Sequence, residues 1–454
     1  MRNRLLHTAL SAFCEEAAWQ LASDAAGGED ELEFEIDEIG GARKSSPLYC
    51  YRPLTGDFID RRQGILSMLP SFLPAIHALQ SCGGLDGYLL ARGENRSSKA
   101  AYGGTPRGRA EEALRCLLSE IFEDSSDFVL HKARFESVYD EFETLVMDGR
   151  AQTEVIATIH GLAIASQRVD LGEGLVLVRA NAAPDAPAEA LHAHDDERPP
   201  VLAELSWESA PGDEAPLRHA HVRLRRLLLA LRLYDATHIA LGRTGWQRTG
   251  GGSWVPFALT PSHSAPVPVR GVCAVPPQQE DELRAFISLV FRRTPKNGEL
   301  AWAMRRFELA CDRPSVTETL TDVLLALRAL LEPEGAHSGH LPDRLAVLCA
   351  IPEQRAIVAE RVSHLASIER SIVAGVGPSE EVLAPLVDEL TDWLRALLRD
   401  VICGHLGQDL YNVADEMIAG ETQSAEPEPA APSVEPTPEF RPAERTPHVA
   451  PWPL

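Results

Sequence analysis

The chain has 454 residues and a formal net charge of −24 at pH 7. A surface with this excess of negative charge repels phosphate backbones, so general binding of RNA or nucleotides is disfavoured and would need a local basic patch. Apolar residues make up 44% of the sequence, which is enough to fill the cores of two or three domains.

Two further properties argue against broad classes of protein. No run of about 18 apolar residues is present, so no membrane span is expected. The eight cysteines are widely separated and include no Cys-x-x-Cys pair, which argues against a zinc site and a disulfide framework. Glu15 and Glu16 interrupt the apolar N-terminal stretch too early for a signal peptide, so an amphipathic first helix fits better. We therefore expect a cytoplasmic protein with neither a metal nor a cofactor.

Residues 1–180 are expected to form a mixed region of helices and strands. Residues Leu32 to Asp37 alternate between apolar and acidic side chains, as in a half-buried strand. The apolar run from Gly174 to Val178 predicts a buried strand. Ala, Pro and Asp then dominate residues 181–200, which we interpret as a surface loop or linker.

Residues 201–297 are predicted to form an α+β segment that leads into a helical region. A strand is expected over Val201 to Ser209. Leucines at three- and four-residue spacing predict a helix from Arg223 to Tyr234. Glycines within the stretch from Trp246 to Leu259 predict the turn of a hairpin.

Residues 298–420 carry the pattern of an antiparallel helical bundle. Ser315 and Glu318 match the Ser-x-x-Glu capping box, and leucines and valines follow at helical spacing up to Leu331. The pattern predicts one buried helix face that must pack against neighbouring helices.

The later helices of this region have clear boundaries. Glycines and a proline within 375–378 end a helix over about 352–373, and Ser379 is positioned to cap the next helix. That helix places its apolar residues, from Leu383 to Val401, on one face. A final helix is expected from Leu406 to Ile418.

We expect residues 421–454 to be a disordered tail. Nine prolines in these 34 residues, interleaved with glutamates, leave little apolar surface to bury. The last four residues, from Pro451 to Leu454, are either a short docking motif or an untethered end. The whole chain is thus predicted to be an α+β protein with a mixed N-terminal region, an antiparallel helical bundle and a disordered tail.

Two pairs of histidines are candidate metal ligands. His192 and His194 lie beside two aspartates in the proline-rich loop, a set of groups that can bind zinc or nickel. His219 and His221 would share one side of a strand, although no nearby acid or cysteine completes a site. Such histidines are more often solvated surface groups, and we favour that interpretation for both pairs.

The phrase Ile372-Val373-Ala374-Gly375-Val376 resembles the Arg-Ser-x-Ile-Val-His-Gly phrase of the HEPN superfamily, in particular of its ApeA-like bacterial branch. Upstream, Trp302 to Phe307 is similar to the family's lead helix. Thr321 to Leu331 is similar to its Ala-Leu-Glu-Ala-Leu helix, and Leu341 to Ala346 to its short Arg-Leu-Ala helix. The resemblance covers residues 222–402.

The resemblance implies an altered active site. Active members are held to cleave RNA without a metal, through a histidine and an arginine five residues before it. In this chain Ala374 occupies the histidine slot, Glu369 occupies the arginine slot, and Arg328 stands where a glutamate is usual. Alanine cannot accept the proton of the attacking 2′-OH. The resemblance therefore predicts a non-catalytic interaction, sensing or antitoxin-like protein of bacterial defence or conflict systems.

An alternative function and a partner also follow. The alternative is a metal-independent ribonuclease that uses non-standard residues, with His340, Arg361 and His364 as candidates. His337 and His340 flank a glycine loop between family-like helices, although loop histidines are usually incidental. HEPN domains usually pair, so the partner implied by the resemblance is a second copy bound through the helical bundle, or another protein.

Overall fold

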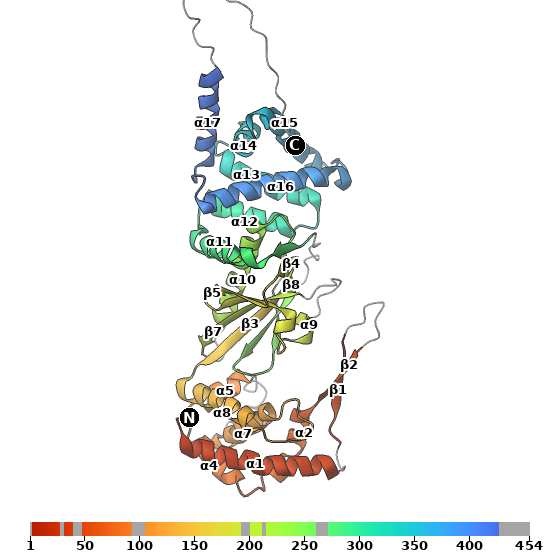
Figure 1. The fold of residues 1–454 in the computed structure, drawn as a ribbon, viewed down its shortest axis with the longest axis vertical. Helices are drawn as coiled ribbons and strands as arrows, with labels where there is room; N and C mark the ends of the chain where they lie inside the picture. The colour runs from red at the N-terminus through yellow and green to blue at the C-terminus, as the bar shows by residue number, and fades with distance from the viewer. Residues whose placement is uncertain are drawn as a thin grey trace, which may run out of the picture.

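The computed structural model describes residues 2–27, 31–39, 48–92, 105–191, 200–210, 215–259 and 271–425. These residues form an elongated α+β molecule with three parts stacked along its long axis (Figure 1). A helical lobe lies at the N-terminal end, an antiparallel sheet lies in the middle, and a helical bundle lies at the other end. The predicted α+β fold class is confirmed.

The N-terminal lobe is a group of helices around an aromatic core. Phe13, Tyr88, Tyr139 and Phe142 are among its fully buried side chains, and Tyr88 packs edge-on against Phe142 with ring centroids 4.8 Å apart. A two-stranded antiparallel hairpin extends from this lobe (Figure 1). The elements are α1 (Arg4–Gly27), β1 (Phe34–Ile39), β2 (Leu48–Pro53), α2 (Thr55–Arg61), α3 (Gln63–Leu66), α4 (Phe72–Gln80), α5 (Leu85–Ala91), α7 (Pro106–Ile121) and α8 (Lys132–Asp148).

The middle of the molecule is a six-stranded sheet in the order β5-β6-β7-β3-β8-β9, with every neighbouring pair antiparallel. The central strand β3 is covered on both faces. Val155 shares a core with the leucines of α10, whereas Ile156, on the opposite face, packs with Ala190 of α9 and with Trp246. The elements are β3 (Ala151–His160), β5 (Arg168–Gly172), β6 (Leu175–Arg179), α9 (Ala188–Leu191), β7 (Val201–Ser209), α10 (Ala215–Tyr234), β8 (Ala240–Thr249) and β9 (Val255–Ala258), with a short parallel pair, β4 (Leu162–Ile164) and β10 (Cys273–Val275).

The C-terminal bundle continues the core of the sheet. Leu227 of α10 belongs to the same apolar cluster as Leu327 of α13 and Leu394 of α16. Helix α13 is central and packs against α12, α14, α15, α16 and α17. No helix in the described ranges is both long enough and apolar enough to cross a membrane. The helices are α11 (Glu280–Arg293), α12 (Glu299–Asp312), α13 (Val316–Leu331), α14 (Leu341–Cys349), α15 (Arg355–Val373), α16 (Glu380–Cys403) and α17 (Leu410–Ala425).

One boundary differs from the sequence prediction. The core of the N-terminal lobe ends at Ala151, and residues 151–179 form strands β3 to β6 rather than the end of a region spanning 1–180. The reason is long-range pairing, because β3 pairs with β7 without interruption from Ala151 opposite Ser209 to Ile159 opposite Val201. Local sequence patterns do not reveal such pairing.

The segment predicted as a linker, 181–200, is partly attached to the sheet. Ala183 and Ala190 are buried against the face of the sheet that carries Trp246. Residues 192–199, which include His192 and His194, lie outside the described residues. Small side chains allow this segment to lie close to the sheet.

Several predicted elements are present with shifted ends. The strands expected at 174–178 and 201–209 correspond to β6 and β7, and the predicted hairpin corresponds to β8 and β9. The turn of that hairpin includes Gly250 in a left-handed conformation, with φ of +51°. The helix predicted to start at Arg223 begins earlier, at Ala215.

The predicted capping box of α13 does not form. Ser315 and Ser379 are the N-cap residues of α13 and α16, but neither side chain accepts a hydrogen bond from its helix. The Ser315 hydroxyl lies 2.8 Å from the Thr317 hydroxyl, and the Glu318 carboxylate pairs with Arg313 at 3.4 Å. The Ser315 hydroxyl and the Glu318 carboxylate, which would form the capping box, therefore contact other side chains.

The last described helix extends into the region predicted to be a disordered tail. Helix α17 ends at Ala425, so residues 421–425 are helical. The rest of that region, 426–454, lies outside the described residues. The helix begins at Leu410, four residues after the predicted start at Leu406.

We predict that Leu410→Ala lowers the free energy of unfolding by about 2–5 kcal/mol, because the Leu410 side chain is fully buried against the bundle. Met417→Ala is the matched control on the same helix, since Met417 is 39% exposed, and we expect a much smaller loss. Chemical denaturation followed by circular dichroism measures both. Equal stability of the Leu410 variant and the unaltered protein would contradict the packing of α17.

Candidate functional site

The two charged slots of the motif, Arg328 and Glu369, form an ion pair between α13 and α15. The Glu369 carboxylate lies 2.7 Å from the guanidinium of Arg328, and the two side chains are 22% and 20% exposed. Arg328 also lies 3.7 Å from the carboxylate of Glu332, which is almost fully buried. Each charge of the pair is therefore neutralised by the other in a partly shielded setting.

The third slot, Ala374, contributes no chemical group. It is the C-cap residue of α15, its side chain is exposed, and Gly375 follows with φ of +76°. A methyl group neither accepts nor donates a proton. Position 374 therefore offers no proton acceptor.

The three alternative catalytic candidates have separate settings. Arg361 on α15 donates to the Glu389 carboxylate of α16 at 2.7 Å. His340 precedes α14 and lies 3.2 Å from the carboxylate of Glu334. His364 is exposed on α15. No hydrogen bond or ion pair links any two of these three candidates in the described part of the chain.

The prediction that His219 and His221 lie on a strand is wrong. Both belong to helix α10, where residues two positions apart point in different directions. His219 packs edge-on against Trp207 at 5.9 Å, and His221 against Phe257 at 5.4 Å. His337 is exposed. Within the described ranges, no three His, Cys, Asp or Glu residues form a group that could hold a metal ion.

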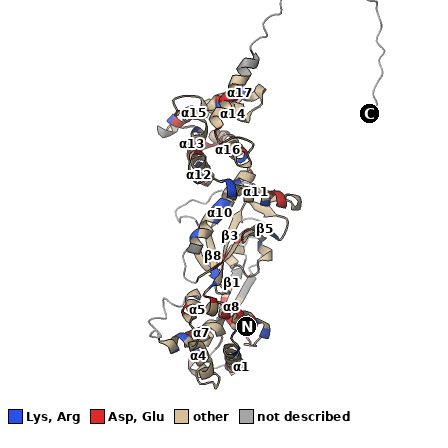
Figure 2. Ribbon diagram, turned by 90° about the vertical axis from the view of Figure 1, so that its left-hand side faces the viewer, with Lys and Arg blue, Asp and Glu red and all other residues tan. Residues whose placement is uncertain are grey.

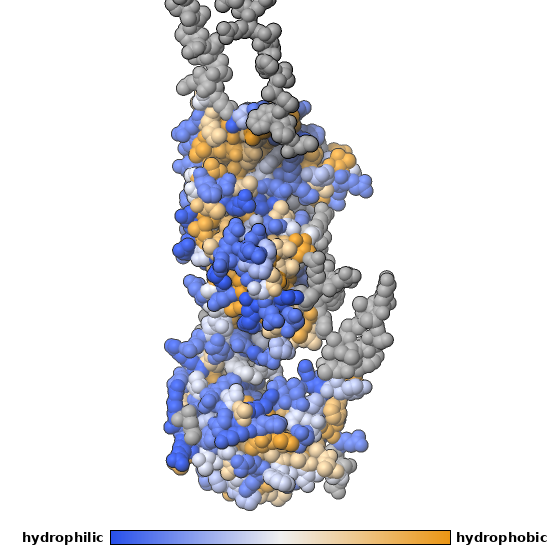
Figure 3. Space-filling view, in the orientation of Figure 1, coloured by the Kyte–Doolittle hydropathy of each residue, from blue (hydrophilic) through white to orange (hydrophobic). Residues whose placement is uncertain are grey.

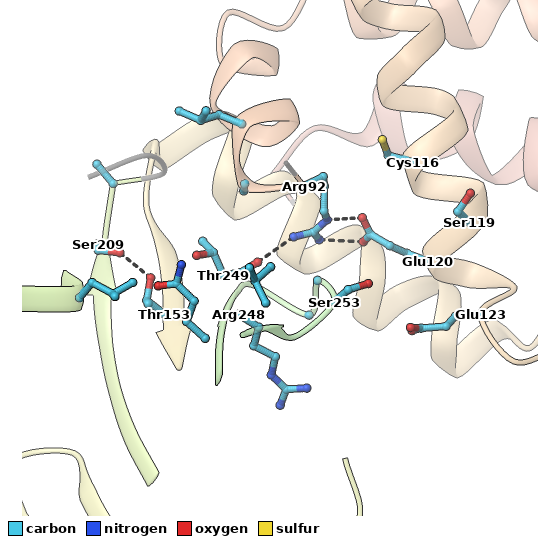
Figure 4. A pocket seen from close by; sticks show the side chains of 18 of the residues that line it. Arg92, Cys116, Ser119, Glu120, Glu123, Thr153, Ser209, Arg248, Thr249 and Ser253 are labelled. Carbon is cyan, nitrogen blue, oxygen red and sulfur yellow. Dashed lines mark hydrogen bonds and ion pairs between the residues drawn. The ribbon is translucent and has the colours of Figure 1, made fainter. Parts of the chain in front are cut away.

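A cavity of about 880 Å³ lies between the N-terminal lobe and the sheet (Figure 4). Its walls come from α5 and α7 on one side and from β3, β7, α10 and the turn between β8 and β9 on the other. The volume falls in the range of small-molecule sites. Its polar lining includes Thr55, Arg92, Arg115, Ser119, Glu120, Thr153, Ser209, Arg218, His221, Thr249 and Ser253.

Arg92 ties the two walls of this cavity together. Its guanidinium donates two hydrogen bonds to the Glu120 carboxylate, one of them at 2.7 Å, and another to the Glu141 carboxylate at 3.2 Å. On the other side it donates to the main-chain carbonyl of Thr249 at 3.0 Å (Figure 4). The turn fits closely here, since a Cβ on Gly250 would lie 1.9 Å from the Glu141 carboxylate.

Arg92 and Glu141 shift each other's pKa in the direction that favours the charged forms. Burial alone would lower the pKa of Arg92, but the hydrogen bonds and charge of Glu120, together with Glu141, raise it above the usual arginine value. Burial raises the pKa of Glu141, and the positive charge of Arg92 opposes that rise. Arg92 is thus charged at every physiological pH and serves as a fixed bridge.

Other polar groups also line the cavity. The Ser119 hydroxyl is buried and has no hydrogen-bond partner among the described residues. Arg218 is exposed on α10, which carries several basic residues where the sheet meets the helices (Figure 2). No Phe, Tyr or Trp is among the described lining residues, so the cavity offers no ring on which a base could stack. Its lining combines the guanidinium groups of Arg218 and Arg248 with the carboxylates of Glu120 and Glu123, so its chemistry suits a polar molecule.

The cavity could not be found from the sequence. Its lining residues come from segments that are far apart in the chain, between Thr55 and Val255, and no short motif contains them. No protein-family model, curated protein or solved structure matches this chain.

We predict that Arg92→Met lowers the free energy of unfolding by about 3–5 kcal/mol, because it leaves Glu120 and Glu141 close together and without their cation. Arg61→Met, which removes the solvent-exposed pair with Glu33, is the control and should cost less than about 1 kcal/mol. Urea denaturation curves measure both changes. Similar small losses in the two variants would show that Arg92 is not a structural bridge.

Proposed function

We propose that this chain is a non-catalytic HEPN-like protein that acts by binding rather than by cleaving RNA. The observation that carries the proposal is the ion pair between Arg328 and Glu369. The two residues are departures from the family phrases at positions where the family has a charge of the opposite sign, and they lie 2.7 Å apart.

A reciprocal exchange of charge accounts for both departures. The family has a glutamate where this chain has Arg328, and an arginine where it has Glu369. Exchanging both charges keeps an attraction between α13 and α15, so the packing of the bundle tolerates the change. The exchange also places a carboxylate where a guanidinium would stabilise the developing charge on a phosphate. Such a site repels the group that a ribonuclease must hold.

The settings of the other candidates support the same proposal. Arg361 and His340 already have carboxylate partners, Glu389 and Glu334. The Arg361 guanidinium would have to leave Glu389 before it could hold a phosphate. Binding roles consistent with the proposal are interaction, sensing or antitoxin-like association with another protein, and pairing of two copies through the bundle.

We predict that the purified protein does not cleave RNA in the presence of EDTA. Cleavage that is abolished by His340→Ala or His364→Ala would refute the non-catalytic proposal and support the ribonuclease alternative. A gel assay with a fluorescently labelled RNA measures the activity, and each variant is checked for folding by circular dichroism.

The same assay tests the charge exchange. The double variant Arg328→Glu with Glu369→Arg should be more stable than Arg328→Glu alone, because the ion pair with position 369 is kept in reversed form while the contact of Arg328 with Glu332 is lost in both. Adding Ala374→His to it supplies the missing proton acceptor, so the triple variant should cleave RNA while the double variant does not. Folding of the double variant no better than that of either single variant would count against the exchange.

We also propose that the cavity between the lobe and the sheet is the sensing site. The supporting observation is the combination of an exposed cation, Arg218, with the unpartnered hydroxyl of Ser119 and the hydroxyls of Thr249 and Ser253. Guanidinium and hydroxyl donors together suit a phosphate or carboxylate that carries hydroxyl groups. The ligand class is therefore a small hydroxylated anion.

We predict that inorganic phosphate raises the melting temperature of the protein at constant ionic strength, because a ligand that binds the folded state stabilises it. Arg218→Glu should remove the shift, since the substitution places a negative charge at the cavity. Arg399→Glu makes the same change of charge at an exposed position on α16 and should leave the shift intact. Identical shifts in all three proteins would mean that phosphate binds elsewhere.

A further inference from the structure

Helix α1 carries an apolar stripe that the other described parts of the chain leave uncovered. Leu5 and Trp19 are 84% and 82% exposed, the highest values among the large apolar side chains of the described residues. Ala12, midway between them, is also exposed. Burial of a large apolar side chain contributes about 1.5–3 kcal/mol, so two such side chains on one helix favour a partner that covers them.

The stripe has a regular geometry. Leu5, Ala12 and Trp19 are seven residues apart, which is close to two helical turns and matches one seam position of a coiled coil. The opposite face of α1, with Leu6 and Leu10, packs into the core of the lobe. Helix α1 lies at the outer end of the molecule (Figure 1), and the surface of this lobe shows apolar areas among polar ones (Figure 3).

The charges of α1 run against its own dipole. Arg4 lies in the first turn, where the dipole is positive, and no ion pair is described for it. Glu15 and Glu16 lie at the middle of the helix and Asp24 lies near its end; Glu16 accepts a hydrogen bond from Ser71 and Asp24 pairs with Arg62 at 3.2 Å, so Glu15 is the exposed acid of the three. A second helix in the opposite direction, centred on Ala12, brings Arg4 within five residues, about 7.5 Å along the axis, of the exposed Glu15 of that helix and places the two helix dipoles in the favourable antiparallel arrangement.

We infer that α1 packs antiparallel against α1 of a second copy of this chain. In this arrangement Leu5 lies opposite the partner's Trp19, and Ala12 lies near the two-fold axis. A contact of this symmetry uses the same patch on both copies, so the Leu5 contact with tryptophan forms twice. The small side chain at the centre allows the two helices to approach closely.

The chemistry of the stripe favours a protein partner over a membrane surface. Helices that lie on membranes are rich in Lys and Arg, whereas residues 5–27 contain neither. The net charge of −24 also repels anionic lipids. The inference does not depend on the proposed function, because the pairing implied by the family resemblance uses the helical bundle at the other end of the molecule.

A contact between single helices is smaller than the roughly 1,600 Å² of a standard interface, so we expect a reversible dimer. Sedimentation velocity at increasing protein concentration should show a rising dimer fraction. Trp19→Glu should make the protein monomeric at every concentration. Met68→Glu, at a position that is 76% exposed in the same lobe, is the control and should leave dimerisation unchanged. A monomeric unaltered protein, or equal dimerisation of the Trp19 variant, would overturn the inference.

A cysteine cross-link tests the direction of pairing. Ala12→Cys places two thiols near the axis, so mild oxidation should give a disulfide-linked dimer on a non-reducing gel. Ser23→Cys lies on the same exposed side but 11 residues away, which puts the two thiols about 33 Å apart in the antiparallel arrangement. Cross-linking of the Ser23 variant as fast as the Ala12 variant would rule out this register. Binding of monomers to phosphatidylglycerol vesicles, lost in Trp19→Glu, would instead assign the stripe to a membrane.

Discussion

The structure depends on strand β3, which lies inside the six-stranded sheet and through which the chain passes from the core of the N-terminal lobe into the core of the sheet. It pairs with β7 on one side and β8 on the other, and it is covered on both faces. Helix α8 of the N-terminal lobe ends at Asp148, only a few residues before β3 begins at Ala151. The left-handed Gly149 makes this abrupt change of direction possible. The position of β3 therefore sets where the lobe meets the sheet, and with it the shape of the cavity.

The parts of the fold that were predictable have signals within one segment. The helices of the bundle and the strands β6 and β7 carry their own apolar periodicity, and the hairpin of β8 and β9 carries its glycine turn. The start of α10 was missed because His219, His221 and their neighbours have no such periodicity; they are helical because Ala220 and Leu224 are buried against the sheet. The cavity was missed for a related reason, since Arg92 and Thr249 meet only in three dimensions.

Arg328 and Glu369 are a second example of a contact that the sequence pattern does not reveal. From the sequence, Arg328 and Glu369 were two separate departures from a family pattern, each of which weakened the resemblance. In the folded chain they form one ion pair between α13 and α15. The sequence contains both residues but does not show that their side chains are in contact. Pairing of this kind becomes visible only once α13 and α15 are placed side by side.

The core shared by the sheet and the bundle has a consequence for the evolution of this chain. Leucines of α10 lie in one continuous cluster with side chains of the sheet and of α12, α13 and α16. A gene fragment that encoded only residues 298–420 would specify helices that lack their packing partners in α10 and the sheet. Recombination could not move the bundle alone into another protein without exposing that surface. The sheet and bundle thus share one core, whereas the N-terminal lobe has a core of its own and could be exchanged only together with the β8–β9 turn that Arg92 and Glu141 contact.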